Sequence, residues 1–324
     1  MAVIIADLKM SIESESYIDA MHAIVAYKGW FSFSKPVLAG MTASAFRFTV
    51  NRRLTAESHT AYNWIAENFL AADFIGVAAS SAAGFSFDAT FPLYKQNAIA
   101  QIKEAIADGT GAIIWNDKFV LAVGYDDAQE ILFLSNGRTE ELELLPYESF
   151  GSNASPYWYY QVFESQIPLD HLEICRESLM QAINKWETHD PMLPEKDYAC
   201  GRAAYDALVM AIKSGDFDHR GLTVVIRSYA AAKRDIRLYF VELKTYWPKL
   251  QLAEEQYVLV EAVFREAEQL AGSICRRNGL DFEAGKQLID ILAKAQQAEN
   301  RAIEIIKVFM RETIDIRRND IALR

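Results

Sequence analysis

Two polar side chains are expected to meet at one end of a predicted β-hairpin. Residues 119–123 and 131–134 are apolar and β-rich, and a polar segment at 126–129 separates them. This is the pattern of two antiparallel strands joined by a tight turn. Lys118 precedes the first strand and Asn136 follows the second, so the hairpin should bring them together. Such a polar pair could position a substrate or take part in catalysis.

Other potentially reactive groups have simpler explanations. The acidic pairs Asp126-Asp127 and Glu140-Glu141 could act as metal ligands or as an acid and base, but both lie in predicted turns, where Asp is common. Three widely spaced cysteines, with no Cys-x-x-Cys and no histidine at zinc-finger spacing, indicate free thiols. These are Cys175, Cys200 and Cys275. Nucleotide-binding, zinc-hydrolase and serine-esterase motifs are absent, so we expect neither metal nor cofactor.

Two short segments require a separate interpretation. His59 has Ser58 and Thr60 as neighbours, but adjacent residues on a helix point apart, and helix capping explains both hydroxyls. Cys200 precedes Gly201 at the start of a predicted helix, where a thiol pKa can be lowered. No histidine partner for this thiol is evident in the sequence, so we interpret neither segment as catalytic.

The elements around the hairpin predict an α+β domain. A helix is expected from about residue 17 to 27, ending at Gly29, with N-cap candidates at 14–16. Further helices are predicted at 58–70 and 96–108, and further strands at 141–145 and 157–163; residues 75–91 have no clear period. Helices followed by antiparallel strands are typical of this fold class.

Residues 118–127, Lys-Phe-Val-Leu-Ala-Val-Gly-Tyr-Asp-Asp, followed by Leu-Phe-Leu-Ser-Asn at 132–136, resemble the second half of the papain-like cysteine peptidase fold. The form is that of the double-glycine leader peptidases of bacteriocin export and the butirosin biosynthesis protein H N-terminal domain family. In these families a His opens the first strand and an Asp or Asn closes the second. Lys118 and Asn136 occupy these places, and Ala20, on the first helix, occupies the place of the nucleophilic Cys.

The resemblance implies the fold without its thiol chemistry. A thiolate nucleophile and an imidazole base are required, and the chain has Ala20 and Lys118 instead, with no cysteine before Cys175. In the butirosin-like family a segment ending in an aromatic residue and an Arg follows the helix, and residues 45–48 are similar to it. This resemblance makes Arg47 a candidate pocket wall. The candidate binding residues are Asp19, His22, Arg47, Lys118 and Asn136.

Charge distribution predicts two domains. Residues 1–165 carry 10 Lys/Arg against 19 Asp/Glu, whereas 166–324 carry 23 against 25. We therefore expect a papain-like α+β domain at 1–165 and an all-α domain at 166–324. Long helices are predicted at 252–277 and 281–318, the latter with a heptad-like seam that should be buried within the chain or against another subunit. The seam consists of Leu288, Ile291, Ala295, Ala298, Ala302, Ile305 and Phe309.

Composition excludes several classes of partner. The net charge of −11 disfavours binding to nucleic acid or to an anionic membrane. The sequence has neither a signal-peptide pattern nor 18 uninterrupted apolar residues, so a soluble, cytoplasmic and, from the resemblance, bacterial protein is expected. Three function classes remain open: a pseudoenzyme that binds a peptide or small ligand, a butirosin biosynthesis protein H-like acyl or amide transferase, and an assembly protein that acts through its C-terminal helices, which could also form a homo-oligomer.

Overall fold

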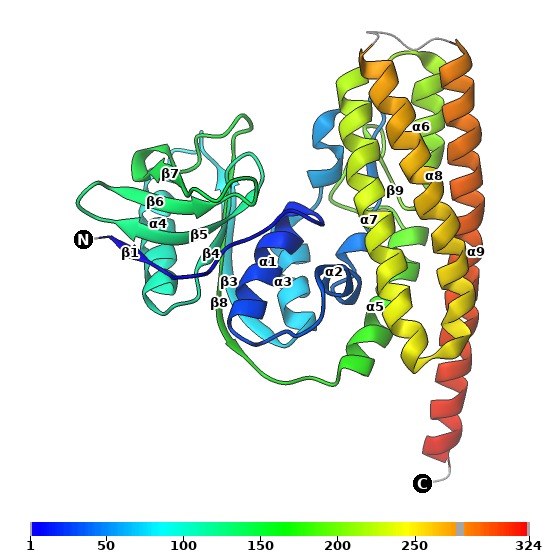
Figure 1. The fold of residues 1–324 in the computed structure, drawn as a ribbon, viewed down its shortest axis with the longest axis horizontal. Helices are drawn as coiled ribbons and strands as arrows, with labels where there is room; N and C mark the ends of the chain where they lie inside the picture. The colour runs from blue at the N-terminus through cyan, green and yellow to red at the C-terminus, as the bar shows by residue number, and fades with distance from the viewer. Residues whose placement is uncertain (1, 277–281, 323–324) are drawn as a thin grey trace. The chain divides into compact units, whose positions relative to one another are not determined.

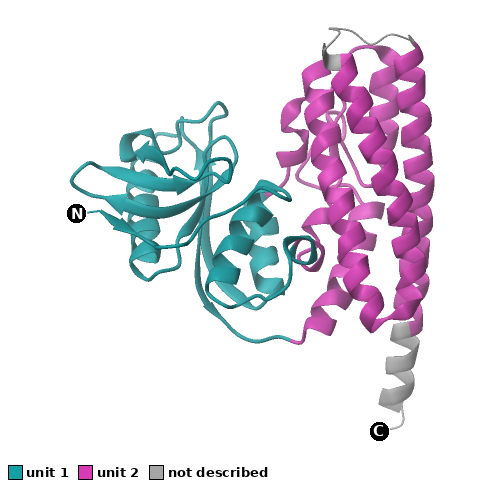
Figure 2. Cartoon of the chain, in the orientation of Figure 1, with its two compact units in different colours: residues 1–38, 64–169 teal, residues 39–63, 170–324 magenta. Residues whose placement is uncertain are grey.

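The chain forms two compact units in a computed structural model that describes residues 2–276 and 282–322. Unit 1 comprises residues 1–38 and 64–169, and unit 2 comprises residues 39–63 and 170–324 (Figure 2). The chain therefore enters unit 2, returns to unit 1 and then completes unit 2. This division differs from a single boundary near residue 165, because residues 39–63 group with the helical unit.

Unit 1 is an antiparallel sheet with helices packed against it. Its helices are α1 Ser16–Tyr27, the start of α2 Lys35–Met41, α3 Trp64–Phe74 and α4 Phe91–Ala107. Its strands are β1 Val3–Ile4, β3 Val77–Phe85, β4 Ala112–Trp115, β5 Phe119–Asp126, β6 Ile131–Ser135, β7 Glu143–Pro146 and β8 Tyr157–Gln166. The predicted α+β class with an antiparallel sheet is confirmed for the described residues.

The sheet is built around β5. Its strand order is β3-β8-β4-β5-β6-β7, and β1 pairs with the last part of β5. The predicted hairpin is present as β5 and β6, with Asp126 opposite Ile131 and an irregularity between Ala122 and Gly124. In the connecting turn the Asp126 carboxylate accepts the Ala128 N–H, which is the local bond that suits Asp to a turn. Since β5 pairs with three strands, it is the centre of unit 1.

Helix α1 packs against β4 and β5 through an apolar face that includes Tyr17, Met21 and Ile24. It ends where the sequence predicted, since Lys28 donates back to Ile24 O and Gly29 adopts a positive φ of 70°. The Tyr17 hydroxyl donates to Gln161 Oε1 of β8 at 2.9 Å, and Gln161 Nε2 donates to Asn68 O of α3 at 3.1 Å. These buried bonds fix α1 and α3 against the sheet.

Three other segments differ from expectation. The aperiodic segment 75–91 contains the nine-residue strand β3, whose small residues alternate in exposure and whose whole length pairs with β8. The helix expected at 58–70 is instead the 3₁₀ segment η2 Ala56–Thr60, in unit 2, and then α3 in unit 1. Helix α4 also begins earlier than predicted, because Pro92 lies in its first turn, where a missing N–H costs nothing.

Unit 2 is a helical bundle with a small two-stranded sheet. Its helices are α5 His171–Glu187, α6 Arg202–Ser214, α7 His219–Tyr246, α8 Gln251–Arg276 and α9 Phe282–Ala322, with 3₁₀ segments η1 Ser44–Phe46 and η4 Pro248–Leu250. Helices α7, α8 and α9 lie side by side (Figure 1), and α5 and α6 pack on α9. The predicted helical C-terminal region is confirmed. The junction between the long helices predicted at 252–277 and 281–318 lies outside the described residues.

Residues 39–63 belong to unit 2 because their side chains complete its core. Strand β2 Thr49–Asn51 pairs with β9 Tyr198–Cys200, so the expectation of an all-α domain at 166–324 is wrong at β9. The hydroxyl of Tyr229 in α7 accepts the Thr49 N–H at 2.8 Å and also bonds to Thr49 O. The Phe48 ring packs edge-on against Tyr205 and Tyr229. A sheet and an aromatic cluster therefore attach this segment to the helices.

The predicted seam of α9 is buried at six of its seven positions: Leu288, Ile291, Ala295, Ala298, Ala302 and Phe309. Ile305 is the exception, because it is half-exposed while the neighbouring Ile306 is fully buried. A strict seven-residue repeat drifts by about 20° per heptad relative to a straight helix. Between Leu288 and Ile305 the drift reaches about 50°, half of the ~100° between successive residues, so the centre of the buried stripe has moved from Ile305 toward Ile306.

Candidate functional site

Lys118 and Asn136 meet at one end of the β5–β6 hairpin. Lys118 Nζ donates to the backbone oxygen of Asn136 at 3.0 Å, and Lys118 is half-buried. The Asn136 side chain has other partners: its Oδ1 accepts the Arg138 N–H at 2.8 Å, and its Nδ2 lies 3.4 Å from Glu143 Oε2. The predicted proximity is therefore present, although the bond runs to the carbonyl and not to the amide side chain.

The turn that carries Lys118 is held in place by its surroundings. Asn116 N–H donates to Lys118 O at 2.8 Å, and Asp117 between them adopts a positive φ of 56°. Asp117 is fastened to the loop before β8, since its carboxylate accepts the Ala154 N–H at 2.7 Å and its own N–H donates to Asn153 Oδ1 at 3.2 Å. This positive φ is sparsely populated for residues other than Gly, so the surrounding bonds must maintain it. The base of the Lys118 side chain is thus well defined.

The electrostatic environment favours the neutral form of Lys118 more than water does. Burial lowers the pKa of the Lys118 ammonium from its ordinary value, and the nearby Arg138 charge lowers it further, while Glu143 opposes both effects. A lysine with a lowered pKa can hold an anionic group or exchange a proton. Besides this amine, the titratable groups that act on the site are the Glu143 carboxylate and the Arg138 guanidinium.

Ser16 of α1 hydrogen-bonds to the hairpin next to Lys118. Its hydroxyl accepts the backbone N–H of Phe119, the residue after Lys118, at 3.3 Å. Ala20, which the family resemblance places at the nucleophile position, lies one turn further along α1 and is fully buried. Residues 14–16 were predicted only as helix caps, so Ser16 was not predicted as a site residue. A signal was available, since Ser16 starts the helix and shares a helix face with Ala20.

Asp19 has a structural role in this arrangement. It is fully buried, its carboxylate lies 3.2 Å from Lys35 Nζ, and the same carboxylate accepts the backbone N–H groups of Glu13 and Ser14. Lys35 also donates to the Ser11 hydroxyl at 2.8 Å. Every one of these partners is internal, so Asp19 fixes the segment before α1 instead of presenting its charge to a ligand.

His22 and Arg47 have recorded partners of their own. The His22 ring lies 2.9 Å from Phe33 O and makes an edge contact with Phe31, so it packs against the segment that follows α1. Arg47 belongs to unit 2, where its guanidinium lies 3.5 Å from the centre of the Tyr62 ring. Of the five predicted binding residues, Lys118 and Asn136 form a pair, and the other three have separate surroundings.

Unit 2 contains a buried ionic cluster that the sequence analysis did not identify. Lys233 Nζ of α7 lies 2.6 Å from Glu299 Oε1 of α9, and the Tyr205 hydroxyl donates to Glu299 Oε2 at 2.7 Å. Tyr257 donates to Glu299 Oε1 at 3.3 Å, and the Lys233 ammonium lies 4.4 Å from the centre of the Phe48 ring. Both charged residues fall on the apolar stripes of their helices, and this was the signal available in the sequence.

The remaining reactive groups do not form a second site. Burial raises the pKa of the Cys175 thiol to about 11, and burial also raises the pKa of Cys200, contrary to the helix-terminus effect considered for it. Cys200 lies in β9, before α6 begins. His59 is bonded to Ala56 O, and burial lowers its pKa. Within residues 2–276 and 282–322 no cluster of His, Cys, Asp or Glu is arranged to hold a metal.

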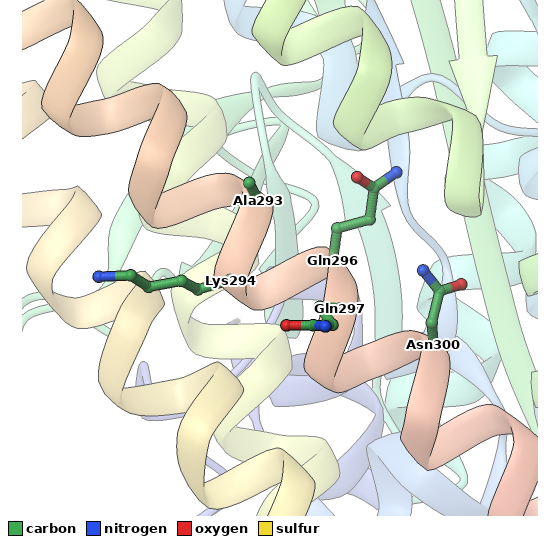
Figure 3. Close-up of a pocket in the computed structure, with 5 residues that line it drawn as sticks. All are labelled: Ala293, Lys294, Gln296, Gln297 and Asn300. Atoms are coloured by element: carbon green, nitrogen blue, oxygen red, sulfur yellow. The ribbon is translucent and has the colours of Figure 1, made fainter.

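An open depression lies on the outer side of α9 (Figure 3). Its lining is Ala293, Lys294, Gln296, Gln297 and Asn300. Gln296 Nε2 donates to Asp206 Oδ1 of α6 at 3.1 Å, so the amide is used to join two helices. The depression is lined by amide groups and one lysine, and this set of side chains does not indicate a particular ligand or reaction.

The comparisons with known proteins add no relative. No protein-family model matches the chain, and no curated protein matches it. Among the helices that the structure describes, none has both the length and the apolar character needed to cross a membrane. The class established here is thus an α+β unit with an antiparallel sheet, together with a helical unit.

Proposed function

We propose that unit 1 is a catalytically degenerate papain-like domain that binds a peptide or small ligand at the Lys118 end of the β5–β6 hairpin. The observation that supports this proposal is the 3.0 Å contact from Lys118 Nζ to Asn136 O, beside the first turn of α1. In the fold that the sequence resembles, these elements hold a base, its orienting residue and a nucleophile. Here Lys118 and Asn136 remain as polar anchors, and residues 1–174 contain no cysteine.

The geometry supports binding more than turnover. Nucleophilic catalysis needs a nucleophile within hydrogen-bond reach of a base. The Ser16 hydroxyl accepts the Phe119 N–H, and the Lys118 ammonium donates to a carbonyl, so each is engaged elsewhere. A half-buried lysine with a lowered pKa can still exchange this internal carbonyl for a ligand carboxylate or carbonyl, because either accepts the same hydrogen bond.

A binding experiment tests the location. The full-length protein is incubated with a randomised octapeptide library, and the peptides that it retains are titrated against Lys118→Ala and Lys95→Ala. Lys95 is a matched control, since it is a lysine of the same unit whose Nζ also donates to a backbone oxygen, that of Glu148, at 3.0 Å. Lys118→Ala should weaken binding at least tenfold and Lys95→Ala should not. Equal effects, or a library from which nothing is retained, would overturn the proposed site.

A second experiment tests whether the site lacks a catalytic nucleophile. Ser16→Cys/Lys118→His should react with a thiol-directed peptide electrophile at residue 16, whereas Ala20→Cys/Lys118→His should not, because position 20 is fully buried. Peptide mapping separates this adduct from any on Cys175, Cys200 or Cys275. Labelling of Ser16 in the unmodified protein by a fluorophosphonate would contradict the proposal, because it would reveal an active serine nucleophile.

A further inference from the structure

A row of aromatic rings leads away from the turn that carries Lys118. Successive ring centres are 4.6, 5.6, 5.1 and 5.0 Å apart. The rings are, in order, Trp115, Trp64, Tyr157, Phe85 and Phe87. The inner end of the row is buried and the outer end is exposed: Trp115 is 8% exposed, Trp64 is half-buried, Tyr157 and Phe85 are 45% and 39% exposed, and Phe87 is 71% exposed. We call this set the aromatic row.

Strand ends explain how the aromatic row forms. Trp115 ends β4 and Tyr157 begins β8, while Phe85 ends β3 directly opposite Tyr157 in the strand register. Trp64 begins α3, and its ring also contacts Phe119, the residue after Lys118. Three neighbouring strands therefore end together beside the proposed site, and each supplies a ring.

The charge around the aromatic row is negative. Asp88 follows Phe87 at the outer end, Asp117 lies two residues after Trp115 at the inner end, and both are exposed. Unit 1 as a whole carries 18 Asp/Glu and 7 Lys/Arg, so the net charge of −11 of the entire chain is that of this unit, and unit 2 is neutral. Such a surface repels anions and attracts cations, most strongly at low ionic strength.

We propose that the aromatic row binds Lys and Arg side chains of an extended basic peptide whose backbone or terminus is held at Lys118. This inference rests on the proposed function, and it names the chemistry of the ligand. Aromatic faces attract ammonium and guanidinium groups within about 6 Å of the ring centre. Same-face side chains of an extended chain repeat every ~7 Å, so a row of rings about 5 Å apart accommodates more than one cation.

Calorimetric titration of the full-length protein tests the ligand class. The probes are peptides of about eight residues with Arg-Ser, Gln-Ser or Glu-Ser repeats, ~26 Å long when extended. The Arg-Ser peptide should bind, the other two should bind at least tenfold more weakly, and its affinity should fall as salt is added. Phe87→Ala should weaken Arg-Ser binding about 2- to 5-fold, the size of one exposed cation–π contact, and Phe85→Ala/Phe87→Ala should weaken it further.

The matched control is Phe69→Ala, which removes an exposed phenylalanine of α3 outside the row and should leave the affinity unchanged. Equal binding of the Gln-Ser peptide would show apolar docking and would overturn the proposed chemistry. So would equal effects of Phe87→Ala and Phe69→Ala, or concentration-dependent self-association that Phe87→Ala abolishes. If Arg-Ser fails while library peptides still bind in a Lys118-dependent way, this inference is wrong and the proposed function stands.

Discussion

Lys233 Nζ lies 2.6 Å from Glu299 Oε1 in the core of unit 2, and both side chains are almost fully shielded from solvent. Burial lowers the pKa of Lys233, and the Glu299 charge opposes that shift, so each charge depends on its partner. A buried pair contributes little net stability compared with apolar residues, but removal of one partner leaves an uncompensated charge. The pair joins α7 to α9 through two residues that lie 66 positions apart in the sequence.

Glu299→Ala should therefore destabilise the protein by about 3–5 kcal/mol in urea unfolding, because Lys233 would remain buried without a counter-charge. Lys233→Met/Glu299→Leu should recover most of the loss. The control is Glu312→Ala, which breaks the exposed 2.7 Å pair with Lys249 and should cost less than about 1 kcal/mol. If Glu299→Ala cost no more unfolding free energy than Glu312→Ala, the buried pair would matter no more for stability than the exposed pair.

Tyr257 should make the free energy of unfolding fall at alkaline pH. Burial and the neighbouring Glu299 raise its pKa well above 10, so above pH ~10 the unfolded chain loses a proton that the folded chain keeps. Stability contributed in this way is present below pH ~10 and is lost as pH rises above it. Tyr257→Phe should reduce the downward slope by up to about 1.4 kcal/mol per pH unit in unfolding measured between pH 9 and 11. Lys233 contributes a slope of the opposite sign, but this contribution is the same in the wild type and in Tyr257→Phe and therefore cancels in the comparison. An unchanged slope would show that Tyr257 does not cause this loss of stability.

Asp19→Ala should destabilise unit 1 by about 3–5 kcal/mol, since it leaves the buried Lys35 ammonium without its carboxylate and frees two backbone donors. Asp19→Asn/Lys35→Gln should be milder, because no charge is then buried alone. Chemical unfolding followed by the fluorescence of unit 1 provides the measurement. A ligand affinity lost in Asp19→Asn/Lys35→Gln, with stability retained, would restore Asp19 as a binding residue.

Ile305 and Ile306 offer a neighbouring pair that tests the packing of α9. Ile306→Asp should cost more than about 4 kcal/mol, because it places an unpaired charge in the core, while Ile305→Asp should cost roughly 1 kcal/mol at a half-exposed position. Thermal unfolding of the two variants gives the comparison. Equal melting temperatures, or the reverse order, would show that the seven-residue repeat and not the straight helix sets the buried face.

The features that were predicted correctly depend on residues that are close together in the sequence. The β5–β6 hairpin and most of the α9 seam follow from apolar periodicity and turn residues, which act over a few positions. Distant partners were not predictable in this way. Asp19 was predicted as a ligand contact, and only the fold shows that Lys35 lies beside it; Arg47 was predicted as a pocket wall, and only the fold shows that it belongs to unit 2. Ser16 was missed because helix position alone does not determine which turn of α1 meets β5.

The pairing of β5 along both of its edges has a consequence for backbone dynamics. One edge pairs with β4 and then with β1, the other edge pairs with β6, and nearly all of its side chains are buried. Such amides exchange with deuterated solvent only when a large part of the unit opens. Exchange from residues 119–126 should therefore report the global opening of unit 1. The amine of Lys118 is thus carried by one of the least mobile segments of the unit, so a ligand would meet it already in position and would lose little entropy in ordering it.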